Sequence, residues 1–278
     1  MSVPDIFDRA VRRRRRDRAL QDFGAHDFLR AAMLDGIAER LDAVTRDFAE
    51  FLDIGCYDGG FLPPPAARIA RLDPGYRFAQ RSGGVQGDED RLPFADGSFD
   101  CVISAGVLDQ VGDLPGALTL ARRVLRPDGL FLAAFVGAGS FPMLRRALAE
   151  GERDRPVARL HPQVDVRSAG DLLMRAGFAL PVADVETLSI GYPHLFRLIE
   201  DLRGMGGTSI LADRHPLSRD ALARAATAFA GMAGPDGRVR ERVEILFLTG
   251  WAPDPSQPKP ARRGSGTASL AQTLGSRP

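Results

Sequence analysis

Lysine is almost absent from this sequence of 278 residues: Lys259 is the single lysine, and arginine supplies the rest of the positive charge. We interpret this bias as genomic base composition rather than chemistry. A large excess of either charge is also missing, because 37 basic residues face 36 acidic ones. The net charge of +1 therefore excludes a molecule built as a whole to attract nucleic acid or an acidic membrane. The 44% hydrophobic composition is that of an ordinary globular protein.

Cysteines and long apolar runs are scarce too. Cys56 and Cys101 are the only cysteines, which excludes a disulfide framework and favours a reducing compartment. No apolar run approaches the length of a membrane span. The early arginine run lacks a following apolar stretch, and Asp5 and Asp8 argue against a transit peptide. We therefore expect a cytoplasmic protein with at most peripheral membrane association through a partner.

Apolar periodicity predicts an alternation of strands and helices, which is typical of a doubly wound, mostly parallel α/β sheet. The uninterrupted apolar run at 130–136 suits a strand that is covered on both faces. The expected elements are two helices within 5–48, strands at 51–54 and 99–104, a helix at 114–125 capped by Asp113 and ended by a turn at 126–129, a strand at 130–136, a helix at 168–176, a strand near 182–190, helices near 193–203 and 217–232, and a strand at 243–251.

These elements divide the chain into three parts. We expect an N-terminal helical cap at 1–48 and an α/β domain at 49–251, followed by a flexible tail at 252–278 that is rich in Pro, Ser, Gly and Arg. Within the α/β domain we place the core at 49–137 and a helical insertion at about 193–232, before the last strands.

The sharpest local feature follows the first predicted strand, where the chain reads D-I-G-C-Y-D-G-G from Asp53 to Gly60. Ligands of open α/β sheets bind beyond the carboxyl ends of the strands. Glycine at such a point permits positive φ and a close backbone approach. Because a glycine-containing turn also occurs without any ligand, this feature alone leaves both interpretations open.

A second feature is G-D-E-D-R-L-P-F at 87–94, which is followed by S-F-D-C-V-I-S, D-L-P-G-A-L and L-R-P-D-G. Together with the first loop, this ordered set resembles the class I S-adenosylmethionine-dependent methyltransferases over residues 50–136. The resemblance implies a Rossmann-like fold with S-adenosylmethionine as cofactor. It assigns the methionine side of the cofactor site to Asp53, Gly55 and Gly59, in the loop that also holds Tyr57, the adenine side to Asp88 and Glu89, and the pocket edge to Ser104.

Three further segments narrow the resemblance: I-F-D-R-A-V-R-R-R-R-R-D-R-A-L at 6–20, Y-P-H-L-F-R-L-I-E-D-L-R-G-M-G at 192–206 and A-R-R-G-S-G-T-A-S-L at 261–270. They are similar to the methyltransferase-like assembly factors of respiratory NADH dehydrogenase (complex I) and their bacterial relatives. This implies a protein substrate, an NADH dehydrogenase subunit, that is modified by arginine hydroxylation or methyl transfer.

The sequence departs from that family at the cofactor loop. Tyr57 stands where the family carries glycine, and Gly55 and Asp88 are only 33 positions apart, so we expect one crossover helix to be missing. We find no acid between Pro74 and Gly84, and we place Asp73 before the second strand. The acid that holds the ribose in relatives would then be absent. These departures favour an alternative, a non-catalytic assembly scaffold, which a cavity filled by Tyr57 would support.

Other candidate sites are weaker. The five arginines at 12–16 point in all directions on a helix and have no interleaved aromatic residues, so we expect a solvated or partner-docking helix and no nucleic-acid site. Histidines lack local ligand spacing, and we predict no metal site, although His161 and Asp165 with a distant partner stay open as an iron triad. Tyr192 and Trp251 are expected in the core.

Overall fold

In this computed structural model the structure describes residues 5–154 and 157–258. Its sheet has seven strands in the order β3-β2-β1-β4-β5-β7-β6. Strands β1 to β5 pair in parallel, and β7 lies antiparallel between β5 and β6. The prediction of a doubly wound, mostly parallel sheet is therefore confirmed. The strands are β1 (Glu50–Ile54), β2 (Arg68–Asp73), β3 (Val85–Gln86), β4 (Phe99–Ala105), β5 (Leu125–Val136), β6 (Ala179–Tyr192) and β7 (Val239–Trp251).

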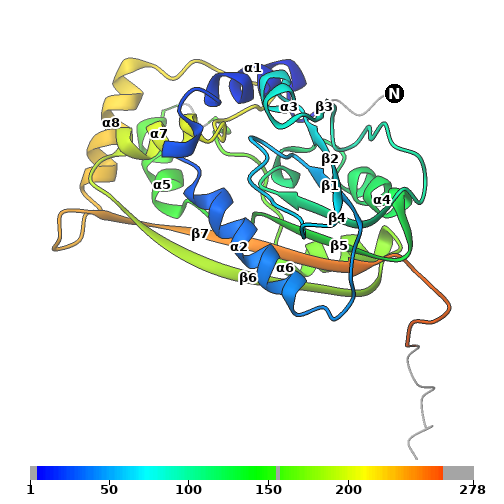
Figure 1. The fold of residues 1–278 in the computed structure, drawn as a ribbon. Coiled ribbons are helices and arrows are strands. Elements are labelled where there is room, and N and C mark those ends of the chain that lie inside the picture. The colour runs from blue at the N-terminus through cyan, green and yellow to red at the C-terminus, as the bar shows by residue number, and fades with distance from the viewer. Residues whose placement is uncertain (1–4, 155–156, 259–278) are drawn as a thin grey trace, which may run out of the picture.

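Helices cover both faces of this sheet (Figure 1). On one face Met33 and Ile37 of α2 pack on buried side chains of β1, β4 and β5. On the other face α4 and α6 pack on the opposite sides of the same strands. The helices are α1 (Arg9–Ala19), α2 (Phe28–Asp42), α3 (Tyr76–Ser82), α4 (Leu114–Val124), α5 (Pro142–Gly151), α6 (Val166–Arg175), α7 (Leu195–Gly204) and α8 (Arg219–Ala230), with 3-10 turns η1 (Phe23–Ala25) and η2 (Leu108–Gln110).

The crossover between β1 and β2 contains no helix, as the short spacing predicted. Residues 55–67 form turns and irregular chain, with prolines at 63, 64 and 65. Phe61 of this segment packs against Phe51 on the face that α2 also covers. The sheet therefore keeps that face covered although a crossover helix is absent.

The turn predicted at 126–129 lies inside a strand instead. β5 begins at Leu125, directly after α4, and its register against β4 shifts between Phe99 and Cys101. Asp128 takes φ +60°, and its amide donates to the carbonyl of Ala252. Pro127 and Gly129 thus mark a bulge rather than a loop, because the chain bends without leaving the sheet.

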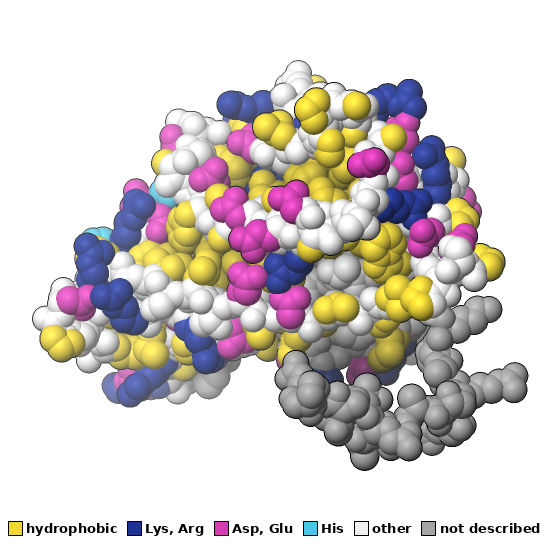
Figure 2. Space-filling view, turned by 60° about the horizontal axis from the view of Figure 1, so that its bottom comes forward, with side chains coloured by type: hydrophobic (Ala, Val, Ile, Leu, Met, Phe, Trp, Pro, Cys, Tyr) yellow, Lys and Arg dark blue, Asp and Glu magenta, His cyan; other side chains and the backbone are white. Residues whose placement is uncertain are grey.

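The helices predicted near 193–203 and 217–232 are α7 and α8, between β6 and β7. With α5 they enclose a separate apolar cluster beside the long ends of β6 and β7 (Figure 1). Among the described residues, no helix is both long and apolar enough to cross a membrane. The face in Figure 2 carries acidic and basic side chains interspersed between apolar patches. The tail motif at 261–270 lies outside the described residues.

Candidate functional site

The loop after β1 turns sharply at the carboxyl edge of the sheet. Gly55 and Gly59 take φ of +77° and +83°, and a Cβ at Gly55 would clash with the side chain of Val107. Tyr57 takes φ +49° between them, a left-handed conformation that a bulky residue adopts only when its surroundings hold it there. The loop therefore has the close-approach geometry that its glycines predicted, but it carries a large side chain at its centre.

The ring of Tyr57 fills the space at this edge. Its hydroxyl donates to the carbonyl of Gly106, after β4, at 2.9 Å. Phe23 stacks on the ring with centroids 4.8 Å apart, and Phe78 meets it edge-on at 5.4 Å. Tyr57 is only 4% exposed. The ring is thus a core residue of a small aromatic cluster that includes Val107.

Asp73 corrects the sequence analysis. β2 runs from Arg68 to Asp73, so this acid ends the second strand instead of preceding it. The error arose because Arg68 and Arg71 interrupt the apolar pattern and because the missing helix brings β2 forward. The buried carboxylate accepts from the amides of Tyr57 at 2.8 Å and Gly75 at 2.7 Å. An acid therefore stands at the end of the second strand, the position to which the resemblance assigns the ribose.

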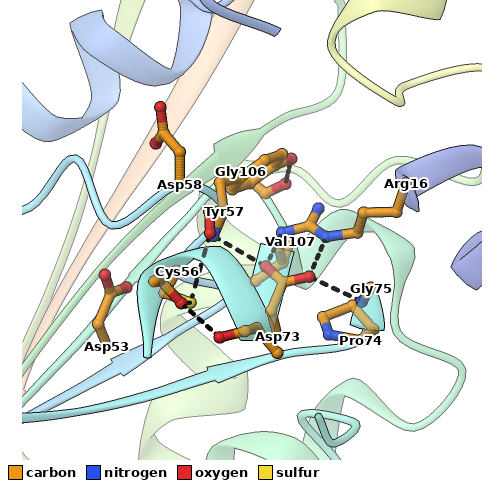
Figure 3. Close-up of polar contacts among 12 residues, drawn as sticks. Arg16, Asp53, Cys56, Tyr57, Asp58, Asp73, Pro74, Gly75, Gly106 and Val107 are labelled. Carbon is orange, nitrogen blue, oxygen red and sulfur yellow. Dashed lines mark hydrogen bonds and ion pairs between the residues drawn. The ribbon is translucent and has the colours of Figure 1, made fainter. Parts of the chain in front are cut away.

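The carboxylate of Asp73 is paired with an arginine of α1, Arg16 (Figure 3). Arg16 donates through Nε and Nη2 to the two oxygens of Asp73, both at 2.7 Å. Its guanidinium carbon lies 3.5 Å from the centroid of the Tyr57 ring. Burial alone would lower the pKa of Arg16, but Asp73 outweighs it and raises that pKa. Arg16 and Asp73 are 3% and 0% exposed, so this is a buried bidentate pair.

The carboxylates of the acidic loop 88–90 are also paired with arginines of α1. Arg12 makes a bidentate pair with Glu89 at 2.6 and 2.7 Å, and both side chains are buried. Burial would lower the pKa of Arg12, but the charge of Glu89 raises it. The other pairs are Arg13 with Asp88 at 2.7 Å and Arg9 with Asp90 at 2.7 and 2.5 Å.

The expectation that the arginines point in all directions on a solvated helix was therefore wrong for part of α1, because Arg12 and Arg16 are buried. Residues 9, 12, 13 and 16 follow the spacing i, i+3, i+4, i+7 and form one stripe that faces the acids. Arg14 is exposed, as expected of a solvated helix face. The spacing was visible in the sequence, but its acidic partners are more than 50 residues away along the chain.

Asp53 and Ser104 lie in neighbouring strands deeper in the same edge. Both side chains are fully buried, and none of their side-chain oxygens has a hydrogen-bond partner. Burial raises the pKa of Asp53 to about 6, opposed by the charge of Arg30, whose Nη2 lies 3.9 Å away. These oxygens are the unpartnered polar atoms that a cofactor site would present. Of the predicted set, Asp53, Gly55, Tyr57, Gly59 and Ser104 meet at one edge, with Asp88 and Glu89 beside it under α1.

S-adenosylmethionine does not fit this conformation. The carboxylates that would hold it are present, but Arg16 and Arg12 occupy Asp73 and Glu89, and the Tyr57 ring fills the space between the ends of β1 and β4. The cavity between α1 and the acidic loop has a volume of about 10 Å³, room for about one water molecule. A larger hollow of about 480 Å³ lies between α5 and α8, away from these residues.

The remaining candidates have structural roles. His161 accepts from the amide of Ile210 at 2.9 Å and packs edge-on against Phe7. Asp165 caps α6 by accepting from the amide of Ser168. Within 5–154 and 157–258 no three His, Cys, Asp or Glu side chains form a group that could hold a metal. Tyr192 is buried and Trp251 is half-buried, packed beside Phe48, as the core interpretation predicted.

The sheet order and the acid-lined carboxyl edge define the fold of class I methyltransferases. A family described as "Methyltransferase domain" matches residues 52–133. The solved structure of a SAM-dependent methyltransferase from Thermotoga maritima superposes with a TM-score of 0.52 at 17% identity, covering 86% of this chain and 99% of that one.

Curated relatives narrow the class further. The chain is 35% identical to arginine-hydroxylase NDUFAF5, mitochondrial, of Danio rerio, over 96% of this chain and 89% of the relative. It is 30% identical to malonyl-[acyl-carrier protein] O-methyltransferase of Laribacter hongkongensis, over 85% and 87%. The chain belongs to the arginine-hydroxylase NDUFAF5 family within the class I methyltransferase fold.

Proposed function

We propose that this chain acts on an arginine side chain of a protein, a subunit of respiratory NADH dehydrogenase during its assembly, and that it hydroxylates this arginine rather than methylating it. The name of the NDUFAF5 relatives, which align with nearly the whole chain, supports arginine as the target. One observation favours hydroxylation over methyl transfer: Tyr57 and Arg16 fill the space in which a methyl donor would lie.

Mass spectrometry of substrate peptides tests this proposal. The purified full chain is incubated in air with a reductant and with peptides that cover the arginines of NADH dehydrogenase subunits, with and without S-adenosylmethionine. We expect one arginine to gain a single oxygen atom from O2, while the other oxygen atom is reduced to water by two electrons from the added reductant, with no dependence on S-adenosylmethionine. The matched control replaces that arginine by lysine. Gain of a methyl group on arginine by the wild-type chain would contradict the proposal.

A second candidate function is an assembly scaffold that binds the subunit without changing it. The filled cofactor space favours this function too, because an enzyme that uses S-adenosylmethionine needs that space open. Calorimetry with S-adenosylmethionine on the wild type and on Tyr57→Gly tests whether the tyrosine closes the space, and the peptide assay then separates a hydroxylase from a scaffold. No binding by the wild type with binding restored in Tyr57→Gly would mean that the tyrosine closes a former pocket. Co-purification of an unmodified subunit would then support the scaffold.

A further inference from the structure

The guanidinium of Arg16 makes the kinds of contact that a bound guanidinium ligand would make. The two oxygens of Asp73 clamp its edge at 2.7 Å, and the Tyr57 ring lies under its plane at 3.5 Å. A planar guanidinium is recognised by this combination, a bidentate carboxylate with an aromatic face. The groups around Arg16 therefore form a complete guanidinium-binding site.

The hydrogen bonds that fix Asp73 and the Tyr57 hydroxyl do not involve α1. The amides of Tyr57 and Gly75 fix the Asp73 carboxylate from the β1 and β2 loops. The hydroxyl of Tyr57 is anchored on Gly106, and Phe78 supports the edge of its ring. These anchors belong to the sheet edge and to α3, so they stay in place when Arg16 leaves. Phe23, which stacks on the ring, and Ala19 of α1 pack against the same cluster.

The attachment of α1 beside this site depends largely on ion pairs. Arg9, Arg12 and Arg13 hold it to the acidic loop 88–90, while its buried apolar residues are Val11 and Ala19. Emptying a buried pair is costly, since the remaining charge lacks a partner. Exchanging one arginine for another avoids that cost, because the carboxylate keeps a guanidinium throughout.

We propose that the site formed by Asp73 and Tyr57 binds an arginine side chain of a partner protein, and that Arg16 occupies it in this conformation as an intramolecular stand-in that the partner's arginine displaces. This inference rests on the proposed function and adds to it the groups that recognise arginine and the segment that competes with it. The arginine stripe of α1 then has to move away before a substrate segment can contact the acids.

Chemical rescue tests the site. Arg16→Ala in the full chain is melted with N-acetyl-arginine N-methylamide as probe, at constant ionic strength, with the citrulline analogue as uncharged control. We expect the arginine probe to raise the melting temperature of Arg16→Ala and the citrulline analogue to leave it unchanged. Arg16→Ala/Asp73→Asn should not respond. The wild type should need about 10- to 1,000-fold more probe, because its free site is a minor state.

Two results would overturn the inference. One is equal stabilisation of Arg16→Ala by the arginine probe and the citrulline analogue. The other is stabilisation of Arg16→Ala by S-adenosylmethionine with none by arginine, which would make the site a nucleoside site. If Arg16→Ala does not fold, hydrogen exchange on the wild type replaces it: the probe should speed exchange of α1 amides while β5 stays protected. Unchanged α1 exchange would overturn the inference in that case.

The outcomes also separate this inference from the proposed function. Rescue by arginine without any modified peptide or bound subunit would leave the site standing and remove the function. A hydroxylated subunit peptide with no arginine rescue would support the function and remove the site.

Discussion

The pair of Arg12 with Glu89 gives the sharpest test of how α1 is held. Arg12→Met removes the guanidinium and keeps a long side chain of similar helix propensity. Glu89, 1% exposed, is then left as a buried carboxylate without its bidentate partner. Removing one member of a buried pair costs about 3 to 5 kcal/mol. For a domain near this size, that loss corresponds to a melting temperature lower by about 6 to 20 °C.

Arg14→Met is the matched control, since Arg14 lies on the exposed face of the same helix. Its substitution should change stability by less than about 0.5 kcal/mol. Arg12→Met/Glu89→Leu removes both charges and should recover most of the loss. Urea unfolding followed by circular dichroism measures all three. If α1 detaches locally, the loss appears as faster exchange of its amides. Equal stability and equal α1 exchange in Arg12→Met and Arg14→Met would refute the reasoning.

Two further predictions concern the loop and the buried acid. Tyr57→Phe should lower the free energy of unfolding by about 1 kcal/mol, because it removes the hydrogen bond to Gly106. Tyr57→Gly should lower it by about 2 to 4 kcal/mol, because losing the ring costs about 3 to 5 kcal/mol and relief of the positive φ returns about 1 kcal/mol. Urea unfolding in which Tyr57→Gly is as stable as the wild type would contradict this. The pKa of Asp53 is raised to about 6, so between about pH 4 and 6 this acid is protonated in the folded state and ionised in the unfolded state. As pH rises through that window, the free energy of unfolding of the wild type should fall by up to about 3 kcal/mol relative to Asp53→Asn. Unfolding curves of both proteins from pH 4 to 7 with a constant difference would count against it.

Much of the fold could be predicted from the sequence because its strongest signals are local. The apolar run at 130–136 and the period of the helix after Asp113 depend only on neighbouring residues. β2 was harder to predict: Arg68 and Arg71 break its pattern, and the position of the strand depends on a helix that is absent. The role of Asp73 was misjudged for the same reason.

The site was harder to predict because its partners are distant in sequence. No residue near Arg12 or Arg16 in the sequence indicates that they pair with Glu89 and Asp73. In a run of consecutive arginines, the sequence also does not show which of them lie on the same face of the helix as a stripe. The pairing depends on the folded sheet edge, where the ends of β2 and β3 meet α1. The hypothesis that Tyr57 fills the cofactor space was correct, because a large side chain in a glycine position of this loop can pack in few directions.

The survival of the acids does not by itself indicate a working cofactor pocket. Once Arg16 pairs with Asp73 and Arg12 with Glu89, losing either partner leaves a buried charge, so stability alone is a sufficient reason for both members to be present. Such pairs would keep a methyltransferase-like acid set in place even after cofactor binding had ended. The quantity that separates a closed enzyme from a scaffold is therefore the free energy of releasing Arg16 from Asp73. An arginine of a partner that replaced Arg16 would lower that free energy by exchange, whereas a neutral ribose offers Asp73 no replacement charge, so we expect arginine to open this site more readily than a nucleoside does.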